Sequence, residues 1–121
     1  MVPPNLSIHP ARMTLAEIET LWGGDADPPL PECTYDPELH TGPDLAVETS
    51  AERAAREAVA REVCATCPAR ALCDRYALDA RPSFGIWAGR TAAEIDTHAQ
   101  ISELYEAMRA RAADPAGVEV A

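Results

Sequence analysis

The sequence predicts an all-α protein, a small bundle of about four short helices organised around four cysteines. The pattern Thr-x-x-Glu, in which a capping Thr is followed three residues later by Glu, occurs at Thr14, Thr49 and Thr91. The segments that follow these caps are rich in Ala, Arg and Glu, which favour helix. No segment shows the alternation of apolar and polar residues that is typical of a strand.

The first predicted helix covers residues 15–22. Thr14 caps this segment, apolar residues recur in it at helical spacing, and the pair Gly23-Gly24 ends it. Residues 1–13 contain three prolines, which disfavour regular structure, so we expect a flexible N-terminal tail there.

Residues 23–48 are predicted to form a long loop, because five prolines interrupt any regular helix or strand. A loop of this length is unusual in a compact domain unless something holds it. Cys33 lies within the loop, so we expect this cysteine to attach the loop to the rest of the domain.

Two further helices are predicted on either side of a pair of cysteines. The first begins after Thr49 and reaches Cys64, and its Glu and Arg residues are spaced four apart, as in pairs that stabilise a solvated helix surface. The other begins at Pro68, where proline suits a first turn, and it ends near Ala80 because Pro82 follows.

The last predicted helix begins after Thr91, and a turn over residues 81–90 precedes it. Apolar residues at helical spacing predict an apolar stripe along this helix. The stripe consists of Ile95, Ile101, Leu104, Tyr105 and Met108. We therefore expect one helical domain over residues 14–112 and a flexible acidic tail over residues 113–121.

The charge balance bears on the kind of partner. Acidic residues number 20 and basic residues 10, all of them Arg, so the formal net charge is -10. A phosphate-binding surface requires clustered cations, so this balance argues against autonomous nucleic-acid binding and favours a protein partner. No apolar run reaches the length of a membrane helix and the N-terminus lacks the features of a secretory signal, so we expect a cytoplasmic protein without membrane contact.

The four cysteines are Cys33, Cys64, Cys67 and Cys73. Their pattern is C-x2-C-x5-C with the fourth cysteine 31 positions upstream, and four thiolates can bind an iron–sulfur cluster or zinc. Structural zinc commonly uses two C-x2-C pairs, so three clustered cysteines and a remote one favour the cluster. Disulfides or free thiols are the remaining interpretation. His40, seven residues after Cys33, is the histidine expected nearest to the site.

Two other functions remain open at this point. A zinc-bound protein-interaction module would use the same four cysteines without redox chemistry. A thiol–disulfide reductase would use Cys64 and Cys67, although the sequence lacks the βαβ context of thioredoxin-like enzymes. No Ser/His/Asp set and no phosphate-binding loop stand out, so we expect neither an enzyme nor a small-molecule substrate.

Several motifs together resemble the WhiB-like (Wbl) family of iron–sulfur transcription regulators of actinobacteria and their phages. They are Cys33 with Asp36-Pro37-Glu38-Leu39, then Cys64-x2-Cys67-Pro68-x4-Cys73, then Tyr76-Ala77-Leu78, then Gly85-Ile86-Trp87-Ala88-Gly89, and finally Thr91-x2-Glu94. The resemblance covers residues 22–94 with its elements in the family's order. The cysteine pattern combined with the tryptophan turn is more specific than either motif alone.

The resemblance implies a 4Fe–4S cluster on the four cysteines, held by a small helical protein that regulates transcription in response to oxygen or nitric oxide. In the cluster-free form it implies a disulfide bond. It also implies binding to the C-terminal domain of the primary sigma factor, within the RNA polymerase holoenzyme, through a turn that contains Phe84, Gly85, Ile86, Trp87 and Gly89. Two interpretations of this turn stay open: Trp87 lies at that partner surface, or Phe84, Ile86 and Trp87 cap a thin core, and both can hold for different residues of the turn.

Contact with DNA is expected only as part of that complex. Many members of the family end in a basic segment that contacts DNA, whereas here Arg109 and Arg111 stand among acidic residues. Autonomous DNA binding is therefore expected to be weak or absent.

Overall fold

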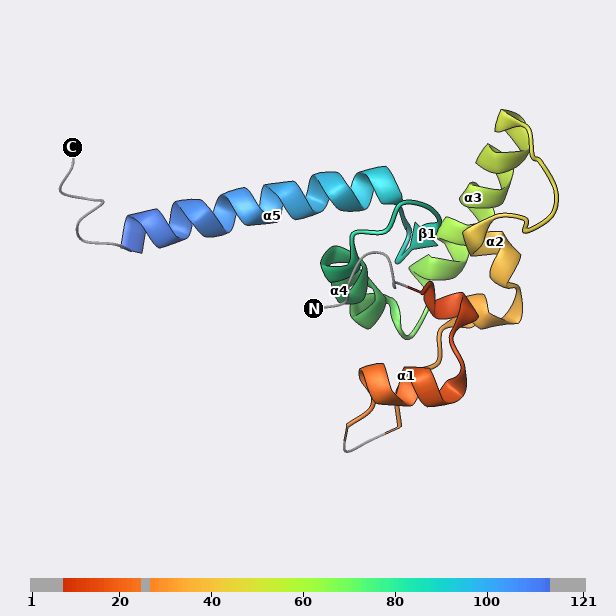
Figure 1. Cartoon of the computed structure of the whole chain (residues 1–121), viewed down its shortest axis with the longest axis horizontal. Coiled ribbons are helices and arrows are strands. Elements are labelled where there is room, and N and C mark those ends of the chain that lie inside the picture. The colour runs from red at the N-terminus through yellow and green to blue at the C-terminus, as the bar shows by residue number, and fades with distance from the viewer. Residues whose placement is uncertain (1–7, 25–26, 114–121) are drawn as a thin grey trace.

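The computed structural model describes residues 8–24 and 27–113, and its helices confirm the predicted all-α class (Figure 1). The α-helices in this part of the chain are α1 (Leu15–Trp22), α2 (Pro37–Thr41), α3 (Ser50–Ala65), α4 (Arg70–Ala80) and α5 (Ala92–Ala113). Two short 3-10 helices, Pro10–Arg12 and Glu32–Tyr35, and the strands β1 (Ile86–Trp87) and β2 (Arg90–Thr91) complete the described elements. None of the described helices is long and apolar enough to cross a membrane.

The helices begin at the predicted caps. The side chain of Thr14 accepts a hydrogen bond from the backbone N–H of Glu17, and the Glu17 side chain accepts one from the Thr14 N–H, which forms the capping box of α1. The same two bonds form between Thr49 and the Glu three residues later at α3, and likewise from Thr91 at α5. A capping side chain of this kind stabilises a helix by about 1 kcal/mol.

The predicted loop over residues 23–48 is partly helical. The 3-10 helix Glu32–Tyr35 carries Cys33, and α2 follows it with Pro37 at its first position. Proline excludes a long helix here but is tolerated in a first turn, so it begins a short helix that composition does not reveal. The first cysteine therefore lies on a defined element and not on an irregular loop.

The prediction of a flexible tail over residues 1–13 is wrong from Ile8 onward. The residues before Ile8 lie outside the described part of the chain. Tyr76 on α4 donates its hydroxyl proton to the Ile8 carbonyl (2.9 Å) and accepts a hydrogen bond from the Ile8 N–H (3.1 Å). His9 is 4% exposed, and Met13 packs against the main apolar cluster. The prolines exclude a long helix but permit a short 3-10 helix, which holds this segment against the domain.

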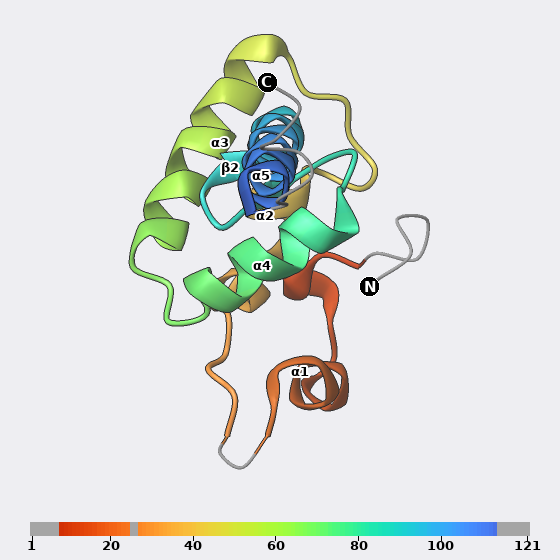
Figure 2. The ribbon, with the colours of Figure 1, turned by 90° about the vertical axis from the view of Figure 1, so that its left-hand side faces the viewer.

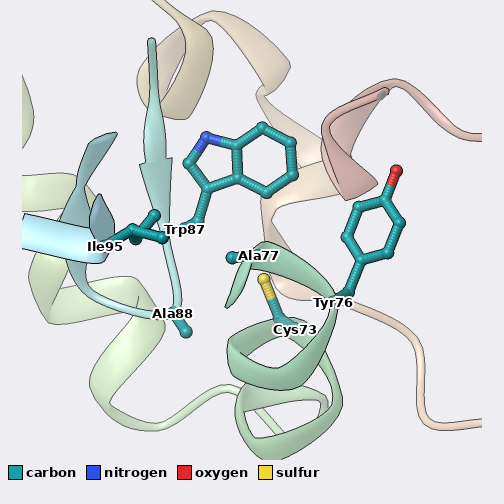
Figure 3. Close-up of a cluster of buried hydrophobic side chains, with 6 residues drawn as sticks. All are labelled: Cys73, Tyr76, Ala77, Trp87, Ala88 and Ile95. Atoms are coloured by element: carbon teal, nitrogen blue, oxygen red, sulfur yellow. The ribbon is translucent and has the colours of Figure 1, made fainter. Parts of the chain in front are cut away.

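The main apolar cluster lies between α4, β1 and the first part of α5 (Figure 3). Its buried members are Cys73, Tyr76, Ala77, Trp87, Ala88 and Ile95. Trp87 is 2% exposed, and its ring centroid lies 5.8 Å from that of Tyr76. Alanines with no exposed surface, such as Ala60 and Ala80, let neighbouring backbones approach closely, so a few large side chains are enough to fill this core.

β1 and β2 form a two-residue antiparallel hairpin that the sequence does not predict. Ala88 and Gly89 connect the strands, and both have positive φ (54° and 84°), as a type I′ turn requires. Strands of two residues are too short for an alternating pattern, so the sequence predicts only the turn.

α5 packs against the domain only through its first part. Ile95 and Ala99 are buried, but the rest of the predicted stripe is about half exposed: Ile101 48%, Leu104 60%, Tyr105 59% and Met108 56%. Figure 1 shows the outer half of α5 extending away from the other helices, and Figure 2, which looks along α5, shows α3 and α4 on two sides of it. The helix continues to Ala113, the first residue of the predicted acidic tail, and the rest of that tail lies outside the described residues.

Candidate metal centre

The four cysteines line one cavity. Cys33 comes from the 3-10 helix Glu32–Tyr35, Cys64 from the end of α3, Cys67 from the turn between α3 and α4, and Cys73 from the first turn of α4. The other lining residues are His9, Pro31, His40, Val63, Arg70, Ile86 and Ala88. Elements that are far apart in the sequence thus supply thiols to a single space.

Hydrogen-bonded turns set the positions of three of these cysteines. α3 ends just after Cys64, and the Cys67 N–H donates to the Cys64 carbonyl (3.2 Å), so the C-x2-C pair lies on one turn. The Cys73 N–H donates to the Ala69 carbonyl (2.9 Å) in the first turn of α4. Ala69 has no exposed surface, which allows α4 to begin close to the cysteine pair.

All four cysteines are free thiols, three of them buried and Cys67 partly exposed. Burial raises the pKa of Cys33 to about 12, with smaller contributions from the Cys67 and Cys64 thiols. Burial also raises the pKa of Cys64 and of Cys73. These three thiols therefore stay protonated at neutral pH unless a cation compensates the thiolate charge, which is what a metal centre provides.

The hairpin turn provides further compensation. The backbone of Gly89 and Ala88 acts against the rise that burial causes in the pKa of Cys64, and the backbone of Ala88 does the same for Cys73. The positive charge of Arg70, which lines the cavity, acts on Cys64 in the same direction. Hydrogen bonds to sulfur and nearby charge are two of the factors that set the potential of iron–sulfur sites.

The donor set differs from that of a single-ion site. Within residues 8–24 and 27–113, no group of three His, Cys, Asp or Glu side chains converges closely enough to hold one metal ion. Zinc requires its sulfur ligands about 2.3 Å from one point, whereas a cluster binds each thiolate through a different iron and spaces the sulfurs more widely. The four thiols that line one cavity are the donor set that a cluster requires.

Two histidines also line the cavity, and the sequence predicts only His40 near it. His9 is held by both ring nitrogens: Nδ1 accepts from the Ala11 N–H (2.9 Å), and Nε2 donates to the Ile86 carbonyl (2.6 Å). Burial lowers the pKa of His9 to about 4, so this ring is neutral at pH 7. The sequence around His9 contains no motif that links this residue to the cysteines. The segment of His9 is held in place by a hydrogen bond between Ile8 and Tyr76, which is 68 positions further along the chain.

The predicted partner-binding turn is divided between the core and the surface. Ile86 and Trp87 are 0% and 2% exposed, so these two residues fit the interpretation in which the turn caps the core, and the placement of Trp87 at a surface is wrong for this structure. The Trp87 Nε1 donates to the Phe84 carbonyl (2.7 Å), and the indole centroid lies 4.5 Å from that of His9. Phe84 is 59% exposed. Because a short apolar run on a turn has neither helical nor strand periodicity, the sequence could not predict which of its residues are buried and which are exposed.

Gly85 brings this turn close to α2. Its φ is 92°, a value that favours glycine, and a Cβ there would lie 3.0 Å from Trp87 Nε1 and 3.3 Å from the His40 carbonyl oxygen. The close approach therefore depends on the absence of a side chain. It places the predicted turn directly against the element that carries His40.

Phe84 borders a surface groove of about 570 Å³. The groove lies between the connection that follows α2, the first part of α3 and the turn, and its walls include Val47 and Arg53. Val47 is fully exposed. Phe84 and Val47 are thus two exposed apolar side chains in a groove that charged residues also line.

The family comparison covers the part of the chain that carries the cysteines. The profile of the family described as Transcription factor WhiB matches residues 33–97, more than half of the chain and a span that includes all four cysteines. The transcriptional regulator WhiD of Streptomyces coelicolor is 50% identical over 44 residues, which are 36% of this chain and only 39% of that protein. No solved structure matches the chain significantly. The chain therefore belongs to the WhiB family of transcription factors.

Proposed function

We propose that this protein is a 4Fe–4S transcriptional regulator that responds to oxygen or nitric oxide and acts by binding the C-terminal domain of the primary sigma factor. One observation carries the proposal: four free thiols surround a single cavity in a chain that belongs to a transcription-factor family. Family membership supports the regulation of transcription, and the arrangement of the thiols supports the cofactor.

Cys33, Cys64, Cys67 and Cys73 would hold the cluster, which when bound would supply redox chemistry and reactivity towards nitric oxide. The chain's own groups determine the surroundings of the four sulfurs. Burial limits access of water, the backbone of Ala88 and Gly89 lies beside the thiols, and Arg70 offsets negative charge. The four cysteine ligands would hold the 3-10 helix Glu32–Tyr35, α3 and α4 around one centre.

The electrostatics of Cys33, Cys64 and Cys73 disfavour the alternative of a thiol–disulfide reductase. A reductase needs a thiolate, and its attacking cysteine has a lowered pKa. Burial raises the pKa of Cys64, which belongs to the C-x2-C pair, and of Cys33 and Cys73 as well. Thiols of this kind are poor nucleophiles at neutral pH but become good ligands when a metal displaces their protons.

The hairpin turn links the cysteines with the surface groove. Ala88 lines the cysteine cavity, and Phe84 borders the groove at the other end of the same turn. Displacement of Cys64 or Cys73 would remove side chains that lie beside Ala88 and Gly89, so the turn would loosen and the groove would change shape. A chemical change at the thiols would thereby reach the surface proposed to bind the sigma factor.

We place the protein in the cytoplasm, in contact with DNA only through the RNA polymerase holoenzyme. The formal net charge is -10, and on the outer half of α5 Arg109 and Arg111 stand among acidic residues. Binding of DNA phosphates requires clustered cations, so direct binding contributes little.

The cofactor is tested by visible absorption combined with iron, sulfide and zinc analysis of the full chain purified without oxygen. The proposal expects a brown protein with about four iron and about four sulfide per chain. A colourless protein with about one zinc ion would contradict the cluster, and with it the redox response.

The partner is tested by measuring the affinity of the metal-loaded protein for the primary sigma factor. Phe84→Ala is expected to weaken binding by at least about tenfold, because removal of an anchoring aromatic typically costs more than about 1.4 kcal/mol. Tyr105→Ala is the matched control, since both side chains are 59% exposed and Tyr105 lies on α5 away from the groove. Equal affinities of the two variants would contradict the assigned surface.

A further inference from the structure

His40 on α2 is a buried polar side chain without a partner. It is 1% exposed, and neither Nδ1 nor Nε2 has a hydrogen-bond partner among the residues that the structure describes. The Ala60 carbonyl lies near the ring but does not meet hydrogen-bond geometry with either nitrogen. Buried polar groups in proteins nearly always have partners, so an unpaired imidazole inside the domain requires an explanation.

The neighbouring His9 shows that this region can satisfy a histidine. The two ring centroids are 5.9 Å apart, and both rings line the cysteine cavity. Both nitrogens of His9 are bonded to backbone groups, at Ala11 and Ile86, so His9 has no free N–H. The missing partner is therefore particular to His40.

The backbone at His40 is fixed on two sides. Arg56 donates from Nη1 to the Leu39 carbonyl (3.0 Å), and the backbone of Gly85 lies directly against the His40 carbonyl. With its backbone held in this way, α2 keeps the ring in the wall of the cavity that the four cysteines also line.

We propose that a ring N–H of His40 donates a hydrogen bond to a sulfur of the cluster in this cavity, either a cysteine thiolate or an inorganic sulfide. The inference rests on the cluster proposed above. A neutral imidazole carries one N–H, and anionic sulfur is the acceptor that the loaded cavity offers it. His40 is thus a positioning residue that bonds to the cofactor environment, and it is not a fifth ligand.

The hydrogen bond sets the reduction potential of the cluster. A donor to sulfur stabilises the more negative, reduced form more than the oxidised form, so it raises the potential. Its removal is expected to shift the reduction equilibrium by roughly tenfold towards the oxidised form, which is about 59 mV for a one-electron couple.

The test uses the full chain, purified without oxygen, as wild type, His40→Phe, His40→Gln and His98→Phe. His40→Phe keeps a ring but removes the donor, and His40→Gln retains an N–H. His98→Phe is the control, because His98 lies on α5 and lines a separate shallow pocket with Arg90 and Thr97. Iron and sulfide per chain are measured first, and then the midpoint potential of each loaded protein.

The expected result is a lower potential for His40→Phe than for wild type, with His40→Gln nearer to wild type and His98→Phe unchanged. Equal potentials in loaded wild type and loaded His40→Phe would overturn the role of His40 while leaving the cluster proposal intact. Absence of iron and sulfide from the wild type would instead overturn the cluster, and the inference with it.

A measurement on the wild type covers the case in which His40→Phe does not fold. The protein is labelled with 15N-histidine, and pulsed EPR of the reduced cluster measures magnetic coupling to histidine nitrogen. Because both nitrogens of His9 are bonded to the backbone, a weak coupling transmitted through a hydrogen bond is expected from one histidine. Absence of any histidine coupling would overturn the proposal, and a strong coupling typical of a nitrogen bound to iron would replace it with direct ligation.

Discussion

The wall of the cysteine cavity and the outer half of α5 differ in how deeply their side chains are buried. Around the cavity, residues from the N-terminal segment, α2, α3, α4 and the hairpin meet, and even Ile86 and His40 are almost completely buried. Beyond Ala99, by contrast, the apolar residues of α5 are about half exposed. The two regions contain helices of similar composition, so composition does not decide which helix is packed.

The difference lies in what stabilises each region. α5 begins with a capping box at Thr91, and Gln100 donates to Asp96 one turn earlier (2.7 Å), so local interactions support this helix. The cavity wall brings together short elements that local interactions alone would not stabilise. It depends on tertiary contacts and, under the proposed function, on the metal centre, which makes it the more fragile region.

The largest effect is expected from removal of a cysteine. Cys73→Ala should lose most of the bound iron and the ordered structure of residues 31–41, because metal binding in such small domains supplies much of the folding free energy. Iron analysis and NMR of the anaerobic protein measure both effects. Leu104→Ala, at a side chain that is 60% exposed, serves as the control and should keep its iron; full retention of iron by Cys73→Ala would contradict the four-thiol site.

Removal of the buried indole should come next. Trp87→Ala is expected to lower the free energy of unfolding by about 3–5 kcal/mol, since it leaves a cavity beside Tyr76 and His9. Tyr105→Ala should change it by no more than about 0.5 kcal/mol. Denaturant unfolding of the metal-loaded proteins compares the two, and similar losses would mean that the outer half of α5 is packed in solution.

The cap of α5 should have a smaller effect that is confined to that helix. Thr91→Ala removes the hydroxyl that accepts a hydrogen bond from the Glu94 N–H (3.2 Å). This change is expected to lower the stability of the helix by about 1 kcal/mol. Circular dichroism should show lost helix while the iron content stays unchanged. Thr97→Ala, at an exposed position within α5, is the matched control, and equal losses in both variants would argue against a specific role for the cap.

The smallest effect concerns the ion pair of Glu48 with Arg56 (2.7 Å), which ties α3 to the connection after α2. The hydrogen bond with Arg56 lowers the pKa of Glu48 below its ordinary value of 4.5. Because the folded value is the lower one, the stabilisation is complete above about pH 4.5 and is lost as the pH falls through the folded pKa.

We therefore expect thermal unfolding to give a higher midpoint temperature for wild type than for Glu48→Gln. This difference in midpoint temperature should be constant near neutral pH and should shrink in acid. Glu106→Gln, on the outer half of α5, controls for the loss of one negative charge. A difference that grows on acidification would have the wrong sign for this ion pair.

The sequence predicts the features of this protein that depend on near neighbours. Capping boxes, helix formers and the prolines that end helices act within a few residues, so the limits of α1, α3 and α4 could be predicted closely. The C-x2-C-x5-C pattern likewise places three cysteines near one helix junction.

The remaining features depend on contacts between distant segments. The burial of Trp87 and the position of His9 follow from the attachment of Ile8 to Tyr76, which no local pattern encodes. Arg56 and Arg61, expected on a solvated face, instead pair with Glu48 and Glu94 on other segments. Apolar residues recur along α5, but their spacing does not show which of them another segment covers.

The attachment of the N-terminal segment has a consequence for the speed of the proposed response. His9 forms part of the wall around the sulfurs, and its segment is held by the two hydrogen bonds between Ile8 and Tyr76. Local opening of such a segment has its own free energy, smaller than that of global unfolding, and an oxidant that enters on this side must wait for that opening. Tyr76→Phe would keep the ring but remove both hydrogen bonds to Ile8. The rate at which an oxidant reaches the thiols would then change, whereas the chemistry at the thiols would stay the same.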